Sequence, residues 1–317
     1  MRRPIFIGKI MENIHWYPGH MTKTRRMMKE NLKLIDVVIE VLDARAPLSS
    51  RNMDLDDLFQ GKVRIIVLNK ADLVNNDYRK KWVDFFQEKG YNVIESISTR
   101  TAGRKKAVSA IERAARDIVL AKQARGINKT VRAMVVGIPN VGKSTFINCI
   151  ANCATAQTGN KPGVTRGKQW VKITPYLELM DTPGMLWPKL ENQSDAQNLA
   201  ILGTIKDDIL DREQLAAELL EKLKRLCPDE LCARYKKLSL ESSGIGLLED
   251  VCKSRGYVLA RGELDTERAC GAVLDDFRSG KIALTALQLP QNITPEMEEY
   301  YGLQRRNARE TGKDDPT

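Results

Sequence analysis

One octapeptide constrains the fold of this chain more than any other stretch, because its spacing is that of a phosphate-binding loop. It follows the apolar run 131–136 and reads Gly137-Ile138-Pro139-Asn140-Val141-Gly142-Lys143-Ser144. Its two glycines allow a tight turn that brings backbone N–H groups against phosphate oxygens with no Cβ in the way. A helix that starts at this loop would add its positive dipole end. The stretch therefore predicts a P-loop nucleotide-binding unit.

The loop offers many hydrogen-bond donors close together, which a triphosphate needs. Lys143 would place a positive charge on the β and γ oxygens, and the Ser144 hydroxyl would bind Mg²⁺. The residues expected to contact the phosphates are Asn140, Val141, Gly142, Lys143, Ser144 and Thr145. The competing interpretation is a glycine turn that holds no ligand.

A second motif, Asn69-Lys70-Ala71-Asp72, follows the apolar run 63–68 and suits a guanine base. The Asp72 carboxylate would accept from both N1–H and the 2-amino group, and adenine has neither donor. Leaving it unpaired would disfavour adenine by about 10⁴-fold or more. Ser98 and Thr99 weakly match the loop that usually supports the base. The chain could therefore be an ATP-using enzyme only if Asp72 lay outside the base pocket.

A third motif, Asp181-Thr182-Pro183-Gly184, follows another apolar strand. Asp181 would hold Mg²⁺ through water, and the Gly184 N–H would detect the γ-phosphate. Thr165 lies in a stretch rich in Gly, Pro and Thr, residues 155–168, which we expect to be mobile without ligand. In the presence of GTP, Thr165 would close over the metal.

The order of elements predicts an α/β fold with a doubly wound, mostly parallel sheet, followed by a smaller all-helical domain. Runs that are apolar on both faces are typical of parallel strands covered by helices. The expected divisions are a GTPase domain over residues 1–192, a helical domain over residues 193–290 that binds RNA or the ribosome, and a frayed polar tail over residues 291–317.

The base-reading motif precedes the phosphate loop, which reverses the common order of these motifs. A sheet whose ends lie close together tolerates cutting and rejoining, so the sequence predicts a circular permutation. The cut falls just after the Asp181 motif. The γ-phosphate switch would therefore run directly into the helical domain and reorient it.

Composition bears on the partner and the compartment. A net charge of +10 would attract polyanions such as nucleic acid, although a solvated basic surface is the alternative. No apolar run is long enough to span a bilayer, so no membrane partner is expected. The six cysteines lack zinc-site spacing and are typical of buried thiols in a reducing cytosol, which favours a cytoplasmic protein.

The motif order, together with three stretches, resembles the YlqF/RbgA family of circularly permuted GTPases. The stretches are the phosphate loop, Trp16-Tyr17-Pro18-Gly19-His20-Met21 and Leu42-Asp43-Ala44-Arg45-Ala46-Pro47. The resemblance implies GTP hydrolysis during late assembly of the large (50S) ribosomal subunit, with the C-terminal helices on ribosomal RNA. We further expect a monomer that attaches in the GTP state and leaves after hydrolysis. The alternative is a GTP-regulated adaptor for a protein or membrane partner.

The catalytic group is not evident from the three motifs. Many GTPases orient the attacking water with a glutamine two residues after the Asp-x-x-Gly glycine, and here that residue is Leu186. The family resemblance implies that His20 acts there, and a structural or RNA-contacting role is the alternative. It also implies that Asn140 helps to hold K⁺, beside the simpler interpretation of a polar loop residue. Lys143 and Thr165 complete the expected catalytic set.

Overall fold

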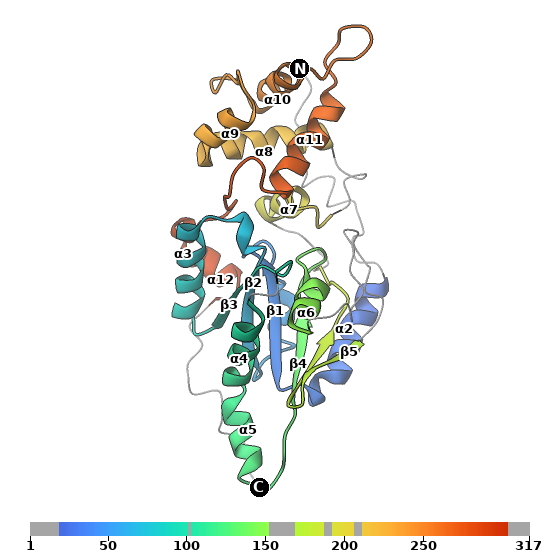
Figure 1. Cartoon of the computed structure of the whole chain (residues 1–317), viewed down its shortest axis with the longest axis vertical. Helices are drawn as coiled ribbons and strands as arrows, with labels where there is room; N and C mark the ends of the chain where they lie inside the picture. The colour runs from blue at the N-terminus through green and yellow to red at the C-terminus, as the bar shows by residue number, and fades with distance from the viewer. Residues whose placement is uncertain (1–18, 101–102, 152–168, 187–191, 206–210, 304–317) are drawn as a thin grey trace.

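Six strands form a single sheet in the computed structural model, which describes residues 19–100, 103–151, 169–186, 192–205 and 211–303 (Figure 1). The spatial order is β3-β2-β1-β4-β6-β5, and only β5 runs antiparallel to its neighbour. The strands are β1 (Val37–Asp43), β2 (Val63–Asn69), β3 (Asn92–Ser96), β4 (Val131–Val136), β5 (Gln169–Thr174) and β6 (Leu177–Asp181). This sheet confirms the predicted doubly wound, permuted fold.

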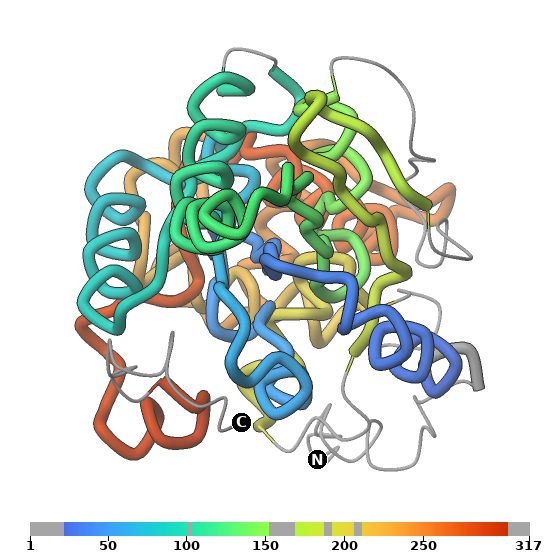
Figure 2. Tube along the Cα trace, turned by 90° about the horizontal axis from the view of Figure 1, so that it is seen from below, coloured from blue at the N-terminus to red at the C-terminus, as the bar shows by residue number. Residues whose placement is uncertain are grey.

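Helices cover both faces of the sheet, as its apolar strands require. Every residue of β1 is buried, which is typical of a parallel strand between two layers. Seen along the strands, α4 lies on one side of the sheet and α2 on the other (Figure 2). The helices of this domain are α2 (Gly19–Asn31), α3 (Asn76–Glu88), α4 (Arg104–Ala114), α5 (Arg116–Gln123) and α6 (Lys143–Ala151).

A helical region follows the sheet, with α8 packed against both α10 and α11. Cap residues fix several of its boundaries: Asp211 and Asp265 accept from backbone N–H groups in the first turns of α8 and α11. Gly256 ends α10 in the left-handed conformation that glycine favours. The helices are α7 (Gln193–Ile201), α8 (Arg212–Leu226), α9 (Pro228–Arg234), α10 (Gly244–Arg255) and α11 (Thr266–Arg278).

Residues 281–303, which we call the return segment, run from α11 back to the sheet domain. The segment contains η6 (Pro290–Asn292) and α12 (Pro295–Tyr300), and α12 lies beside α3 (Figure 1). Trp82 of α3 donates its indole N–H to the Gln288 carbonyl at 3.1 Å, and Tyr301 is 1% exposed. The expectation of a frayed tail is therefore wrong up to residue 303. The few apolar residues of the return segment have no regular spacing, so no sequence pattern predicts that they are buried.

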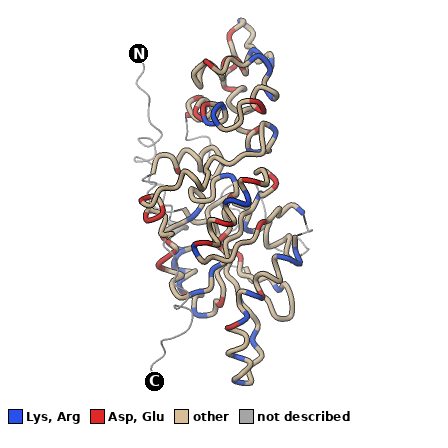
Figure 3. The backbone as a smooth tube through the Cα atoms, turned by 90° about the vertical axis from the view of Figure 1, so that its left-hand side faces the viewer, with Lys and Arg blue, Asp and Glu red and all other residues tan. Residues whose placement is uncertain are grey.

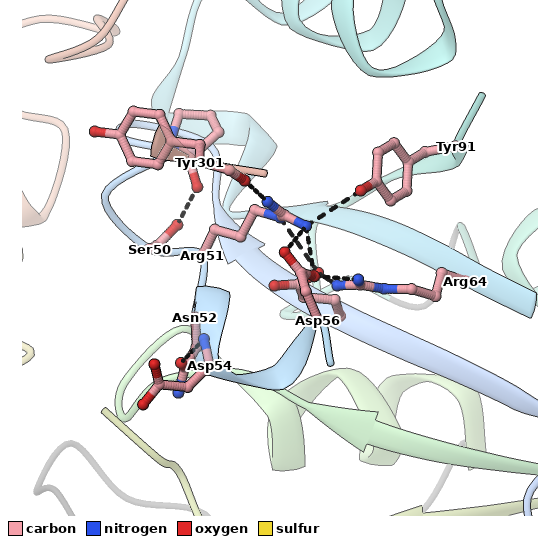
Figure 4. Close-up of polar contacts among 10 residues, drawn as sticks. Ser50, Arg51, Asn52, Asp54, Asp56, Arg64, Tyr91 and Tyr301 are labelled. Atoms are coloured by element: carbon pink, nitrogen blue, oxygen red, sulfur yellow. Dashed lines mark hydrogen bonds and ion pairs between the residues drawn. The ribbon is translucent and has the colours of Figure 1, made fainter. Parts of the chain in front are cut away.

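A buried ion cluster lies where the return segment ends (Figure 4). Arg51 is fully buried and donates to both carboxylate oxygens of Asp56, at 2.7 and 2.8 Å, and to the Tyr91 hydroxyl at 3.1 Å. It also donates to the Tyr301 carbonyl. Arg64 pairs with both Asp56 and Glu40. These contacts fix the return segment against charged groups in the interior of the protein.

The cysteines of the described residues form no disulfides. Five lie there as free thiols, namely Cys149, Cys227, Cys232, Cys252 and Cys270. The sixth, Cys153, lies outside the described residues. None of the helices that the structure describes is both long and apolar enough to cross a bilayer.

Candidate nucleotide-binding site

The carboxyl ends of the parallel strands bring the predicted motifs together along one edge of the sheet. Asp43 ends β1 directly opposite Asn69, which ends β2, and Asp181 ends β6 beside β4. The phosphate loop follows β4, at Gly137. In open α/β sheets this edge is where ligands bind. Motifs that lie far apart in the chain therefore share one site.

Glycines are required in the phosphate loop because the backbone is folded tightly against its surroundings. Gly137 has φ +146°, and a Cβ there would lie 2.5 Å from the Val41 carbonyl oxygen. Gly142 has φ +94°, and a Cβ would lie 2.4 Å from Nδ2 of Asn69. Either contact is too close for an atom pair of this kind. The two glycines thus let the loop pack directly against β1 and the Asn69 side chain.

Lys143 begins α6 and is only 7% exposed. Its ammonium donates to the Ile138 carbonyl oxygen at 2.8 Å, so the side chain curls over its own loop. Burial lowers the pKa of Lys143 to about 8, and the nearby Asp181 carboxylate partly offsets this effect. A desolvated cation in this position suits the oxygens of a triphosphate.

The residues expected at Mg²⁺ lie next to each other. The Ser144 hydroxyl is 2.8 Å from Oδ2 of Asp181, and hard oxygen donors of this kind are the ligands that Mg²⁺ prefers. Gly184 presses against the same loop, where a Cβ would lie 2.7 Å from the Pro139 nitrogen and 3.0 Å from Nζ of Lys143. The Ser144 and Asp181 oxygens therefore fit a magnesium ion. Gly184 lies beside Lys143, which would bind the γ-phosphate.

The base-reading motif is joined directly to the phosphate loop through Asn69. Its side-chain amide donates to the Val141 carbonyl at 2.7 Å, and its carbonyl accepts from the Ser98 hydroxyl at 2.6 Å. Asp72 lies half-buried in η3 (Ala71–Leu73), with Ala71 buried beside it. Ser98 is thus brought to the motif, whereas Thr99 is exposed in the following turn.

Two predicted residues lie beyond what the structure describes. Thr165 is outside the described residues. His20 is the second residue of α2, and its side chain is likewise outside them. Leu186, in the position of the usual water-orienting glutamine, is 1% exposed and purely apolar, so it offers no hydrogen bond to water.

Three contacts at this site involve residues to which the sequence analysis assigned no such role. Asp43 forms an ion pair with Lys70 at 2.8 Å and a two-bond fork with Arg45, at 2.9 and 2.7 Å. On the phosphate side, Asn140 donates its amide to the Gly203 carbonyl at 2.7 Å, just after α7. In the sequence, the only signal for the Asp43 contacts was the Asp43-Ala44-Arg45 stretch at the end of a predicted strand. That stretch marked a motif but did not indicate which residues Asp43 and Arg45 would contact.

The comparisons with known proteins agree with this geometry. A family model described as 50S ribosome-binding GTPase matches residues 132–228. Ribosome biogenesis GTPase A of Bacillus cereus is 40% identical, over 90% of this chain and 97% of that protein. The chain belongs to the ribosome biogenesis GTPase A family. The protein is accordingly a GTPase that binds guanine nucleotide.

More distant members of this GTPase family also match the chain over nearly their full length. Ribosome biogenesis GTPase A of Thermotoga maritima is 30% identical, over 90% of this chain and 97% of that protein. The crystal structure of GNP-bound YlqF from T. maritima has a TM-score of 0.61 and 27% identity, covering 85% of this chain and 99% of that chain. The GDP-bound YlqF structure gives 0.62 and 26%, covering 83% and 99%. The predicted resemblance to the YlqF/RbgA family is confirmed.

Proposed function

We propose that this GTPase serves late assembly of the large (50S) ribosomal subunit in the cytoplasm. As a monomer it binds the precursor particle and its rRNA in the GTP state, and it leaves after hydrolysis. The observation that carries this proposal is the near full-length match, helical region included, to proteins named ribosome biogenesis GTPase A. The net charge of +10 supports an RNA-rich partner. Basic residues, interspersed with acidic ones, occur on the helical region and on the α4–α5 projection (Figure 3).

Each residue of the site has a role in this proposal. Asp72 reads the guanine edge, and Lys143 with the loop backbone holds the phosphates. Ser144, Asp181 and Thr165 would hold Mg²⁺, which neutralises charge on the phosphate oxygens when it is bound. Gly184 detects the γ-phosphate through its N–H. The bond from Asn140 to Gly203 supports a link from the phosphate loop to the helical region.

His20 orients the water that attacks the γ-phosphate, since the neutral imidazole accepts a proton near neutral pH and Leu186 offers no polar group. His20→Ala is expected to lower single-turnover hydrolysis on large subunits by about 10²-fold or more while GTP affinity stays unchanged. Turnover equal to that of the unmodified protein would remove His20 from the mechanism.

A potassium ion beside the phosphates would supply the positive charge that other GTPases obtain from an arginine. Because the Asn140 amide nitrogen is bonded to Gly203, a cation would bind through Oδ1 of the same side chain. Hydrolysis should be faster in KCl than in NaCl, and Asn140→Ala should remove the difference. Equal rates in both salts with the unmodified protein would exclude the potassium role.

Retention on ribosomal particles tests the partner. The protein should co-sediment with purified large subunits in the presence of a non-hydrolysable GTP analogue and not with GDP, and small subunits are the control. Its GTP turnover should also rise when large subunits are added. Binding to anionic vesicles without retention on large subunits would instead favour a GTP-regulated adaptor at a membrane.

A further inference from the structure

The lysine of the base-reading motif is held in place by a neighbouring strand. Lys70 has a left-handed backbone, with φ +57°, which a residue with a side chain adopts only when its surroundings stabilise it. Its ammonium pairs with Oδ2 of Asp43 at 2.8 Å. Since Lys70 lies two residues before Asp72, its four-carbon stem can cover the face of a bound purine while its charged end stays on Asp43.

Asp43 is in turn fixed by Arg45, and both side chains are only 2% exposed. Arg45 donates Nε to Oδ1 and Nη2 to Oδ2 of Asp43, so its planar fork sets the orientation of the carboxylate. The Arg45 guanidinium also holds the pKa of Asp43 well below its usual range, against the effect of burial. The carboxylate that anchors Lys70 is therefore charged and immobile.

Arg45 also reaches the end of the helical region. Its Nη1 donates to the Arg278 carbonyl at 3.2 Å, and its guanidinium lies 5.6 Å from the centre of the Phe277 ring. Both partners are in the last turn of α11. A buried guanidinium needs partners for its charge and its N–H groups, and α11 supplies an aromatic face and a carbonyl oxygen.

The same end of α11 is linked to the phosphate side of the site through the end of α7. The Arg278 guanidinium donates to the carbonyl oxygens of Ala200 and Ile201, at 2.9 and 2.8 Å, in the last turn of α7. Two residues further, the Gly203 carbonyl accepts from Asn140 of the phosphate loop. The end of α11 is thus linked by hydrogen bonds to the base-reading side of the site through Arg45 and to the phosphate side through α7.

We propose that Arg45 is a positioning residue for guanine-nucleotide binding: the end of α11 holds Arg45, Arg45 orients Asp43, and Asp43 fixes Lys70 against the purine. The position of the helical region then sets nucleotide affinity. This link rests on the proposed role of Asp72, because it assumes that the base lies beside this motif. If Arg45 had only a structural role, disrupting its contacts would lower the stability of the fold and leave nucleotide affinity unchanged.

A double-mutant cycle distinguishes these two roles. Phe277→Leu removes the aromatic face under Arg45 and keeps an apolar side chain. It is expected to raise the Kd for GDP about 3- to 10-fold, measured by calorimetry well below the Tm of each variant. In a Lys70→Met background the same change should alter the Kd by less than about twofold, because the linked lysine is absent. Phe59→Leu, at a fully buried phenylalanine outside this series of contacts, should lower the Tm without changing the Kd.

Three results decide the outcome. Equal effects of Phe277→Leu in both backgrounds, or a Kd for GDP unchanged by Phe277→Leu, would overturn the link. If Phe277→Leu does not fold, Arg45→Lys takes its place under the same two criteria, since lysine keeps the charge and loses the fork. ADP binding as tight as GDP binding by the unmodified protein would instead overturn the role of Asp72.

Discussion

The nucleotide edge of the sheet and the contact between the two parts of the molecule are both polar and buried, but they are built differently. At the edge, Asp43, Asn69 and Asp181 lie in one row because parallel strands end side by side. At the contact, which we call the junction, single side chains meet across long chain separations. We use this name for one polar cluster in that contact, formed by Ser49, Asp195, Asn198, Lys222 and Tyr301.

The junction depends on side-chain geometry alone. Asp195 accepts from the Ser49 hydroxyl at 2.5 Å and from the Tyr301 hydroxyl at 2.8 Å, across separations of 146 and 106 residues. Asn198 donates to the Ser49 hydroxyl at 3.0 Å and accepts from Lys222 at 2.7 Å. The edge is thus specified by backbone topology, whereas the junction is specified by four segments that must pack together first.

The largest expected effect tests the edge at the base. Asp72→Asn replaces an acceptor of two hydrogen bonds with an amide that points one donor at guanine's own donors. The affinity for GDP should fall about 10³-fold or more. The affinity for xanthosine diphosphate, which carries a carbonyl oxygen in place of the 2-amino group, should instead rise, because the Asn amide can donate to that oxygen. Calorimetry with both nucleotides measures this, and an unchanged GDP affinity would place the base elsewhere.

An effect of comparable size, on stability, should follow from breaking the buried ion cluster next to the junction. Arg51→Met leaves the buried Glu40 and the half-buried Asp56 with Arg64 alone (Figure 4). The free energy of unfolding should fall by about 3–5 kcal/mol. In the control, Arg132→Met at an ion pair whose arginine is 42% exposed should cost less than about 1 kcal/mol. Equal losses in urea titrations would mean that the cluster does not fix the return segment.

The contrast also explains what the sequence could and could not predict. Apolar runs such as 63–68 and 131–136 specify parallel strands, and the motif after each run must then lie at one edge. The placement of Asn69, Gly137 and Asp181 followed from these rules alone. The burial of Tyr301 did not, because its partners Arg51 and Asp195 lie in separate segments, 250 and 106 residues away along the chain. For the same reason Asp43 and Arg45 were recognisable as a motif without an assignable role.

A smaller effect is expected at the phosphate side of the edge when pH changes. Burial lowers the pKa of Lys143 to about 8, so the free protein loses this charge as pH rises through that value. Phosphate binding favours the charged form, and the Kd for GDP should therefore rise about tenfold between about pH 7 and about pH 9. Arginine stays charged over this range, so Lys143→Arg should remove most of the dependence even if it binds more weakly. The same slope in both proteins would assign the titration to another group.

The smallest effect should come from the junction, where one buried carboxyl responds to pH. Burial raises the pKa of Asp195 above 3.8, although Ser49 and Tyr301 donate to it and Lys222 lies nearby. The folded state then holds this proton more tightly than the unfolded chain, so this group's contribution to stability is lost as pH rises from the ordinary carboxyl range through the raised value. Asp43 acts in the opposite sense, because its pKa is lowered and its contribution is gained as pH rises. Urea midpoints of the unmodified protein and Asp195→Asn isolate the junction, since the amide of the variant has no proton to lose and Asp43 is common to both. If the two proteins keep a constant difference in stability across the carboxyl range, Asp195 does not titrate there and the pH dependence belongs to other groups.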